Sequence, residues 1–205
     1  MRVTSAAADL FGAPALPAGL DYQDDFIAPS DQGRLLKTFE QLPFREATFQ
    51  QYTARRRVVR FGASYDADSA DWPALDWPQW LNELRARVAG RQHVAQDALV
   101  HGLVTEYRPG TPIGWHRDRP KYGMVAGLSL GSAVRMRFRP YDRLHDRSAV
   151  IAFELAPRSL YVMQGDVRWR WQHSIPPAKA LRYSITFRTL AGAATSRAPP
   201  SASRA

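Results

Sequence analysis

The chain contains no cysteine, which excludes disulfide bonds, zinc–cysteine sites, iron–sulfur clusters and cysteine nucleophiles. It also lacks any apolar run near the roughly 18–20 residues that a membrane-spanning helix needs, so we expect no membrane segment. The opening residues, MRVTSAAADLFGAPALPAGL, show no long apolar stretch of the kind found in secretion signals. The expected location is therefore cytoplasmic.

Lysine is scarce: only Lys37, Lys121 and Lys179 stand among the 28 basic residues, and 19 acidic residues leave a net charge of +9. Arginine suits bidentate contact with phosphates and carboxylates, and a basic balance favours an anionic partner such as DNA or RNA. A general bias towards Ala, Arg and Pro explains the same numbers without any partner.

The length of 205 residues suits one domain with short extensions. Residues 1–19 are rich in Ala, Gly and Pro and lack periodicity, which predicts a flexible arm. Residues 192–205, GAATSRAPPSASRA with the Gly first, have the composition of a disordered tail. One domain over residues 20–191 is then expected, and a monomer is the default expectation.

Helix signals come early. Ser30 is a good cap for a helix over about 31–41, whose apolar stripe would be Leu35, Leu36, Phe39 and Leu42. A second helix is expected to start near Pro78 and to stop at Gly90.

Strand signals dominate the rest of the chain. Apolar and polar residues alternate in 134–139 (VRMRFR) and in 181–188 (LRYSITFR), and turn-forming segments separate short strands. The expected class is mainly β (α+β), with a sandwich or jelly-roll core and the helices packed outside it.

A candidate metal site begins with the sequence WHRD. His116 and Asp118 are two residues apart, so on a strand their side chains face the same way, and His173 follows a second strand-like run. Two imidazoles and one carboxylate form the facial triad of non-haem Fe(II) oxygenases. Taken alone, a pair such as His116 and Asp118 is more often two solvated surface residues than a metal site.

Two arginines form a second constellation. Arg182 and Arg188 lie on one face of a strand, with Cα atoms roughly 20 Å apart by strand geometry. They are too far apart to grip one carboxylate together, but they suit opposite ends of a short dicarboxylate, or one could anchor it while the other braces the metal site. A solvent-facing pair remains the alternative.

The combined pattern resembles the AlkB family of Fe(II)- and 2-oxoglutarate-dependent dioxygenases. The matching stretches are TEYRPGTPIGWHRDRPKYGMVAGLSLGSAVRMRFR (105–139) and RSLYVMQGDVRWRWQHSIPPAKALRYSITFR (158–188), with a weaker likeness at LDYQDDFIAPSD (20–31). The shared features are the YxPG turn, HxD, SLGS, GDxRWxWxH and RxSxTFR, in that order.

The resemblance implies a double-stranded β-helix and oxidative demethylation that consumes 2-oxoglutarate and O2 and releases formaldehyde. It implies that His116, Asp118 and His173 hold Fe(II). The cosubstrate residues would be Arg182, Arg188, Tyr107, Thr105 and Ser184.

This sequence departs from the family at three positions. Thr105 and Ser184 stand where the family often has Asn, and both side chains are shorter. Pro120 stands where some DNA-repair members carry an acidic residue that reads a methylated base, and proline offers neither an acceptor side chain nor a backbone donor.

Residues 49–65 (FQQYTARRRVVRFGASY) occupy the place of the family's nucleotide-recognition lid. Phe49 and Tyr52 are predicted to stack on an extruded base, and the run Arg55, Arg56 and Arg57 to contact phosphates. The alternative is a hairpin whose aromatic residues serve the core. The strip of Arg135, Arg137 and Arg139 either lines a binding groove or is the wet face of an edge strand.

Three functions remain open at this point. The leading hypothesis is oxidative demethylation of alkylated bases in DNA or RNA, and Pro120 favours the second, an oxygenase acting on protein or on a small molecule. The third is a nucleic-acid-binding module without catalysis, against which the complete ligand set argues.

Overall fold

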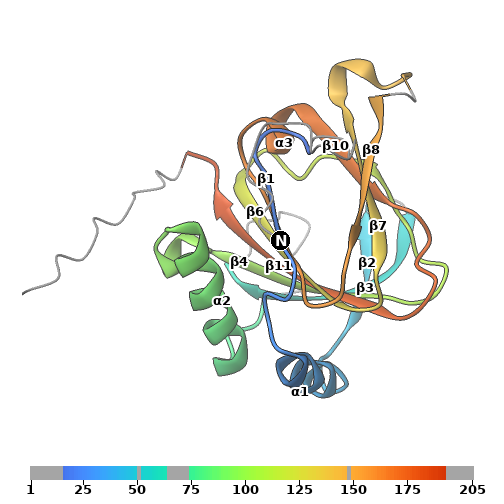
Figure 1. Cartoon of the computed structure of the whole chain (residues 1–205). Helices are drawn as coiled ribbons and strands as arrows, with labels where there is room; N and C mark the ends of the chain where they lie inside the picture. Colours follow the sequence, from blue (N-terminus) through green and yellow to red (C-terminus); the bar gives the residue numbers. More distant parts are fainter. Residues whose placement is uncertain (1–15, 50–51, 64–73, 147–148, 193–205) are drawn as a thin grey trace, which may run out of the picture.

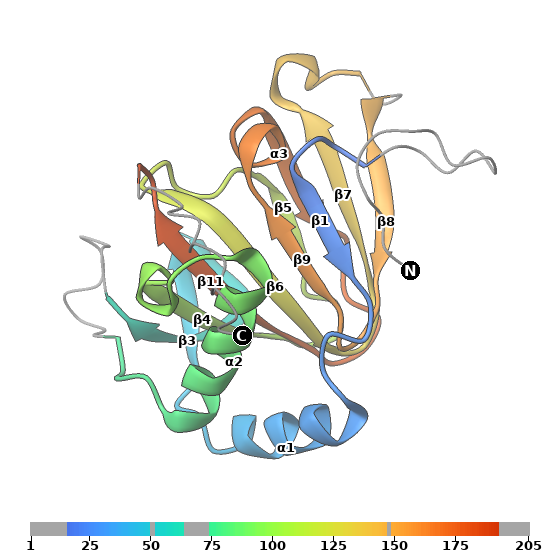
Figure 2. The ribbon, with the colours of Figure 1, turned by 60° about the vertical axis from the view of Figure 1, so that its left-hand side comes forward.

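The strands form two antiparallel sheets that face each other (Figures 1 and 2). This computed structural model describes residues 16–49, 52–63, 74–146 and 149–192. The large sheet has the order β1 (Leu20–Gln23), β9 (Leu160–Met163), β6 (Tyr122–Gly131), β11 (Arg182–Leu190), β4 (His101–Tyr107), β3 (Tyr52–Gly62) and β2 (Arg45–Phe49). The small sheet has the order β5 (Ile113–His116), β10 (Trp171–Ile175), β7 (Val134–Pro140) and β8 (Ile151–Leu155).

The helices lie around this pair of sheets. Helices α1 (Pro29–Phe39) and α2 (Gln79–Gln92) cover the outer face of the large sheet, and α3 (Gly165–Arg170) links β9 to β10 (Figure 2). The turns η2 (Gln96–Ala98) and η3 (Tyr141–Arg143) precede β4 and follow β7. The predicted class, a mainly β jelly roll with N-terminal helices outside, is confirmed. None of the helices in these described ranges has the length and apolarity needed to cross a membrane.

The large sheet is covered on both faces. One core lies between this sheet and the helices, and it includes Leu81 and Val88 of α2 packed with Val104 and Ile185. The other core lies between the sheets and includes Phe138, Leu155 and Val167 among its buried side chains. The side chains that project from the large sheet between the two sheets are therefore enclosed, whether they are apolar or not.

The two alternating strands have different surroundings. On β7 the apolar residues Val134, Met136 and Phe138 are buried, and the arginines between them are half-buried or exposed, as the alternation predicts. On β11 the polar residues are enclosed as well: Arg182 is 1% exposed. The solvent-facing alternative for Arg182 and Arg188 is therefore wrong, because β11 lies at the centre of the large sheet.

Both helices differ from the prediction at their ends. The cap of α1 is Ala28, and the predicted cap Ser30 lies inside the helix, because Pro29 takes a first-turn position and Asp31 accepts a hydrogen bond from the Ala28 N–H. Helix α1 ends at Phe39, before Leu42. Helix α2 passes Gly90 and ends at Gln92, where His93 adopts the left-handed conformation with a φ of 53°.

The end of the predicted arm belongs to the fold. The carbonyls of Ala18 and Gly19 accept hydrogen bonds from the N–H groups of Val167 and Gln164. Gly19 has a φ of +87°, and a Cβ there would lie 1.9 Å from the Gln164 carbonyl oxygen, so only glycine fits. The arm boundary at residue 19 is thus too late, and residues 1–15 and 193–205 lie outside the described residues.

Candidate active site

A cavity of about 800 Å³ opens between the two sheets. Strands β3, β4 and β11 form its wall on the large sheet, and β5 and β10 form the opposite wall. Eight of the site residues predicted from the sequence line this cavity: His116, Asp118, His173, Arg182, Arg188, Tyr107, Thr105 and Arg56.

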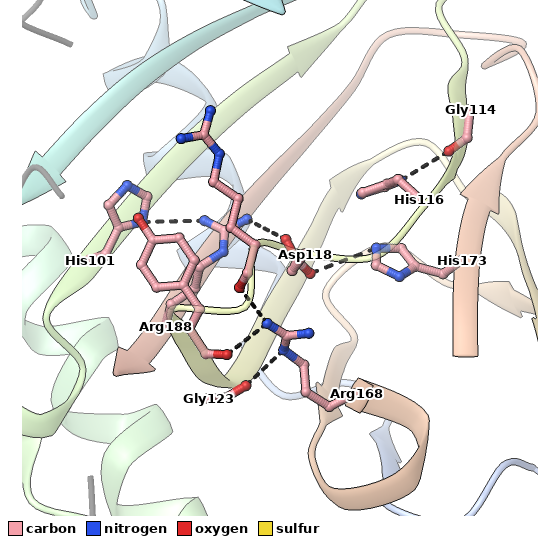
Figure 3. A network of polar contacts seen from close by, with 10 residues as sticks. His101, Gly114, His116, Asp118, Gly123, Arg168, His173 and Arg188 are labelled. Atoms are coloured by element: carbon pink, nitrogen blue, oxygen red, sulfur yellow. Dashed lines mark hydrogen bonds and ion pairs between the residues drawn. The ribbon is translucent and has the colours of Figure 1, made fainter. Parts of the chain in front are cut away.

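The three predicted metal ligands converge at one end of this cavity (Figure 3). His116 ends β5 and pairs directly with His173 on β10, and their ring centroids are 4.2 Å apart. Asp118 follows β5 by two residues, and its Oδ2 lies 3.8 Å from His173 Nε2. Residues 57 positions apart in the sequence are thus brought together by the pairing of β5 with β10.

The protonation of these groups suits metal binding. His116 Nδ1 lies 2.9 Å from the Gly114 carbonyl oxygen, which can only accept, so Nδ1 donates and Nε2 is the ring nitrogen left to face a metal. Burial, aided by the neighbouring His116, lowers the pKa of His173 to about 3, so this imidazole is neutral. Burial raises the pKa of Asp118, but Arg188 and the two histidines overcome that effect and hold it well below its usual range.

The ligand shell is open in this structure. Two neighbouring ligands with metal bonds of roughly 2.1 Å stand about 3 Å apart, less than the 3.8 Å between Asp118 and His173. Accordingly, no three His, Asp or Glu side chains in the described ranges are spaced to hold an ion as they stand. For the pair of Asp118 and His173 the excess is below 1 Å. Two imidazoles and one carboxylate are the donor set of non-haem Fe(II).

Arg188 braces the carboxylate from behind. Its Nη2 lies 3.3 Å from Asp118 Oδ1, and both side chains are almost fully buried. Its Nη1 lies 3.2 Å from Nδ1 of His101, a residue that sequence reasoning missed. The alternation along β4 puts His101 on the same face as Thr105 and Tyr107, so parity was a usable signal.

Arg168 fixes the segment that follows Asp118. This side chain is 3% exposed and donates to the carbonyl oxygens of Gly123 at 2.9 Å, Arg119 at 2.7 Å and Tyr122 at 2.6 Å (Figure 3). Three carbonyls around one guanidinium close the turn between Asp118 and β6. Arg168 lies within the segment GDVRWRW, and nothing in that segment predicts this role.

Arg182 is a buried cation that also lines the cavity. Its Nε donates to Ser129 Oγ at 3.2 Å, and its guanidinium lies 4.8 Å from the centre of the Tyr107 ring. Its buried Nη1 has no acceptor among the described residues, and neither does Nε of Arg188. Unpaired buried donors are costly, so an anion that enters the cavity would gain both. The two carboxylates of a dicarboxylate are groups that could accept from these donors.

The two shortened positions lie side by side. Thr105 on β4 pairs with Ser184 on β11, and both are buried. Thr105 lines the cavity, whereas Ser184 is buried beside it in the sheet. Pro120 is exposed in the turn after Asp118.

The predicted lid is the hairpin of β2 and β3. Phe49 pairs with Tyr52 in its register, and the side chains of Phe49, Tyr52 and Arg55 lie outside the described part of the chain. Arg56 lines the cavity, as does Arg60, which sequence reasoning did not single out.

Arg57 projects from the other face of β3. It forms a bidentate ion pair with Glu106, with N–O distances of 2.8 and 2.7 Å, and its guanidinium lies 5.5 Å from the Phe44 ring. Alternation along the strand explains the split, because Arg56 and Arg57 must face opposite sides. The phosphate contact predicted for Arg57 therefore does not fit its position.

The sequence matches one family model and several known proteins. The family model described as 2OG-Fe(II) oxygenase superfamily matches residues 20–188. The chain is 36% identical over 190 residues to the uncharacterized protein L905 of Acanthamoeba polyphaga mimivirus, covering 84% of this chain and 85% of that protein. It is 28% identical over 175 residues to the tRNA (carboxymethyluridine(34)-5-O)-methyltransferase alkbh8 of Xenopus tropicalis, covering 82% of this chain but only 26% of that protein.

Two further proteins match, one in sequence and one in structure. The chain is 25% identical over 168 residues to the "Probable RNA/DNA demethylase ALKBH6" of Danio rerio, covering 78% of this chain and 70% of that protein. The solved structure of OsALKBH1 superimposes with a TM-score of 0.64 over 86% of this chain and 100% of that one, at 14% identity, which shows a shared fold.

Proposed function

The chain belongs to the 2OG-Fe(II) oxygenase superfamily and is an AlkB-like 2-oxoglutarate-dependent dioxygenase, and from this premise we propose that it removes alkyl groups from nitrogen atoms of bases in DNA or RNA. Enzymes of this family use Fe(II), 2-oxoglutarate and O2. The observation that carries the proposal is the convergence of His116, Asp118 and His173 in the cavity that Arg182 also lines, with the Arg182 Nη1 left without an acceptor among the described residues.

In this proposal one set of residues holds the metal and another holds the cosubstrate. His116, Asp118 and His173 hold Fe(II), which, with 2-oxoglutarate and O2, supplies the oxidation of a C–H bond. Arg182 binds the distal carboxylate of 2-oxoglutarate, and Tyr107 and Thr105 flank it.

Three neighbouring residues support this centre. Arg188 keeps Asp118 ionised and oriented, and Arg168 holds the turn that carries it. Ser184, buried beside Thr105 in the sheet, supports the polar wall at the position where the family often has Asn.

A nucleic-acid substrate is supported by charge and by relatives. The chain carries a net charge of +9. Arg56 and Arg60 line the cavity in addition to Arg182 and Arg188. Two relatives are named for action on tRNA and on RNA or DNA. In this proposal Phe49 and Tyr52 stack on the extruded base, and Arg55 and Arg56 contact phosphates.

The test supplies the purified protein with Fe(II), 2-oxoglutarate and oligonucleotides that contain N1-methyladenine, N3-methylcytosine or etheno-adducts. Formaldehyde, or the aldehyde released from the etheno bridge, and the unmodified base are the expected products. Asp118→Ala is the control: it should abolish turnover while the circular dichroism spectrum stays unchanged. No turnover on any of these substrates, with succinate still formed, would reject the nucleobase substrate.

A second candidate is an oxygenase that acts on protein or on a small molecule. The exposed Pro120 favours it, because it stands where an acidic reader of methylated bases occurs in some DNA-repair members. This alternative predicts succinate formation at a rate that methylated oligonucleotides do not change.

A further inference from the structure

The outer face of the small sheet carries a cluster of arginines and aromatic rings. A bulge in β5 lets Ile113 and His116 both face the other sheet and sends Trp115 to the outside, towards β7. On β7 the same parity puts Arg137 and Arg139 outside, because Met136 and Phe138 are in the core. We define the outer Arg–Trp surface by Trp115, Arg117, Arg137, Arg139, Tyr141 and Trp169.

The centre of this surface is held in place. The guanidinium carbons of Arg137 and Arg139 lie 5.0 and 4.5 Å from the centre of the Trp115 ring. Arg137 Nε donates to Ser174 Oγ at 3.0 Å, and Arg139 donates twice to Gln172 Oε1 at 2.9 and 2.7 Å. Cations oriented in advance lose little conformational freedom when an anion binds.

No neighbouring carboxylate neutralises these cations. Within the described ranges, Arg117, Arg137 and Arg139 form no ion pair with an acidic side chain. Arg135 is not included in the surface, because the acidic residue Glu154 lies directly opposite it in the register of β7 and β8. The three cations thus remain half-buried or exposed without an anion.

The rim of the surface adds exposed rings and reaches the cavity. The guanidinium of Arg117 lies 3.8 Å from the centre of the Tyr141 ring and donates to the Trp169 carbonyl at 3.1 Å. Tyr141 is 46% exposed and Trp169 is 42% exposed. Trp115 and Arg117 also line the cavity, so the surface is continuous with the mouth of the active site.

We propose that the outer Arg–Trp surface binds the single-stranded nucleic acid next to the base that enters the cavity. Unpaired arginines suit phosphates, and exposed aromatic rings suit stacking by unpaired bases, which a duplex cannot offer. The surface is separate from the lid hairpin, since it lies on the small sheet and the hairpin lies at the edge of the large one. The inference deepens the proposed function and rests on it only for its turnover readout.

The first experiment measures binding to the full chain by fluorescence anisotropy. The probes are unmethylated single strands of about 12 nucleotides, one of DNA and one of RNA, with a duplex of the same sequence for comparison. The double variant Arg137→Gln/Arg139→Gln should weaken single-strand binding about tenfold and reduce the salt dependence of log K by about 1.4, the loss of two phosphate contacts. The DNA and RNA arms show which strand is preferred.

Two further variants control this measurement. Arg34→Gln/Lys37→Gln removes the same charge from α1, on the far side of the large sheet, and should bind as the unmutated protein does. Arg137→Lys/Arg139→Lys keeps the charge but loses the planar groups, so it should keep the salt dependence and recover part of the affinity. A recovery of this kind also shows that the Gln variant is not merely unfolded.

Turnover separates this inference from the proposed function. With a methylated oligonucleotide the Gln variant should raise KM by the same factor and leave kcat and uncoupled succinate formation unchanged. Unaltered single-strand affinity of the Gln variant, or equal weakening by the α1 control, overturns the inference. So does tighter binding of the duplex, or no single-strand binding by the unmutated protein. If the strand binds here but no methylated base is repaired, the proposed function fails and the surface stands.

Discussion

Replacing Arg182 by Met is expected to change stability and cosubstrate binding in opposite directions. The side chain is 1% exposed, its Nη1 has no acceptor among the described residues, and the ring of Tyr107 is its nearest aromatic neighbour. A buried cation without an anion destabilises the free protein. Met has similar length and no charge, so it removes this cost.

The size of the stability effect follows from two terms. Exchange of buried ionic groups for apolar ones is neutral to stabilising by about 1–4 kcal/mol. Against this, Ser129 is fully buried and loses the hydrogen bond from Arg182 Nε, which costs about 1 kcal/mol. The net expectation is a gain of about 0–3 kcal/mol, and each kcal/mol raises Tm by roughly 2–4 °C in a domain of this length.

The cosubstrate effect is larger and opposite in sign. Two charge-assisted hydrogen bonds from Arg182 to a carboxylate are each worth about 1.5–3 kcal/mol, so their loss should weaken 2-oxoglutarate binding roughly 10²- to 10⁴-fold. Thermal unfolding with Fe(II) under argon, with and without 2-oxoglutarate, measures both effects. A ligand at a hundred times its Kd stabilises the unmutated protein by about 2.7 kcal/mol, and the variant should show no such shift.

Arg170→Met is the matched control, because Arg170 is exposed at the end of α3. It should leave Tm and the 2-oxoglutarate shift unchanged. The reasoning is refuted if Arg182→Met keeps the full shift. It is also refuted if the free variant is destabilised by more than about 2 kcal/mol, since Arg182 would then be paired in the free protein.

Three further predictions concern charged groups around the site. Arg188→Gln should weaken metal affinity about 10- to 100-fold. Without Arg188, burial has more weight and raises the pKa of Asp118. As the pH is lowered, the variant should therefore lose metal at a higher pH than the unmutated protein, as measured by calorimetric titration. Arg168→Met should lower the free energy of unfolding by about 2–4 kcal/mol in urea, because three carbonyls lose their donor; an unchanged urea midpoint would contradict this. Glu106→Gln should cost about 1–3 kcal/mol at neutral pH, discounted because Arg57 is one-third exposed. Burial raises the pKa of Glu106, but Arg57 outweighs that effect and lowers it. The stabilisation by the ion pair is therefore present above the unfolded pKa of about 4.3 and is lost as the pH falls through the lower folded pKa. In acid, the unmutated protein and the Gln variant should have the same free energy of unfolding.

The metal-site residues were predictable because their spacing is local or their flanks are distinctive. His116 and Asp118 stand two residues apart in the sequence, and they converge even though Asp118 lies beyond the end of β5, whereas His173 was found through the segment around it. The supporting residues were harder to find. Arg168 acts through backbone carbonyls, which leave no mark in the sequence of the residues that supply them. His101 reaches Arg188 only through the pairing of β4 with β11.

Helix ends were less predictable than helix positions. Ser30 is the better capping side chain, yet Ala28 caps α1, because Pro29 is accepted only in the first turn and Asp31 supplies the reciprocal hydrogen bond. In α2 the favourable stop signal at Gly90 was overridden by two more residues of helix and a left-handed His93. Local propensities of about 1 kcal/mol are easily outweighed by packing against the sheet.

The same alternation has opposite meanings on β7 and β11, and the reason is the layering of the fold. Period 2 establishes which residues share a face but not what covers that face. β7 lies in the small sheet, whose inner face packs into the core between the sheets, so Met136 and Phe138 go inside and Arg137 and Arg139 go outside. β11 is central in the large sheet, which has helices on one side and the small sheet on the other, so its polar face becomes a wall of the cavity between the sheets. An arginine on β7 therefore meets solvent and whatever binds the surface, whereas Arg182 meets only what enters the pocket.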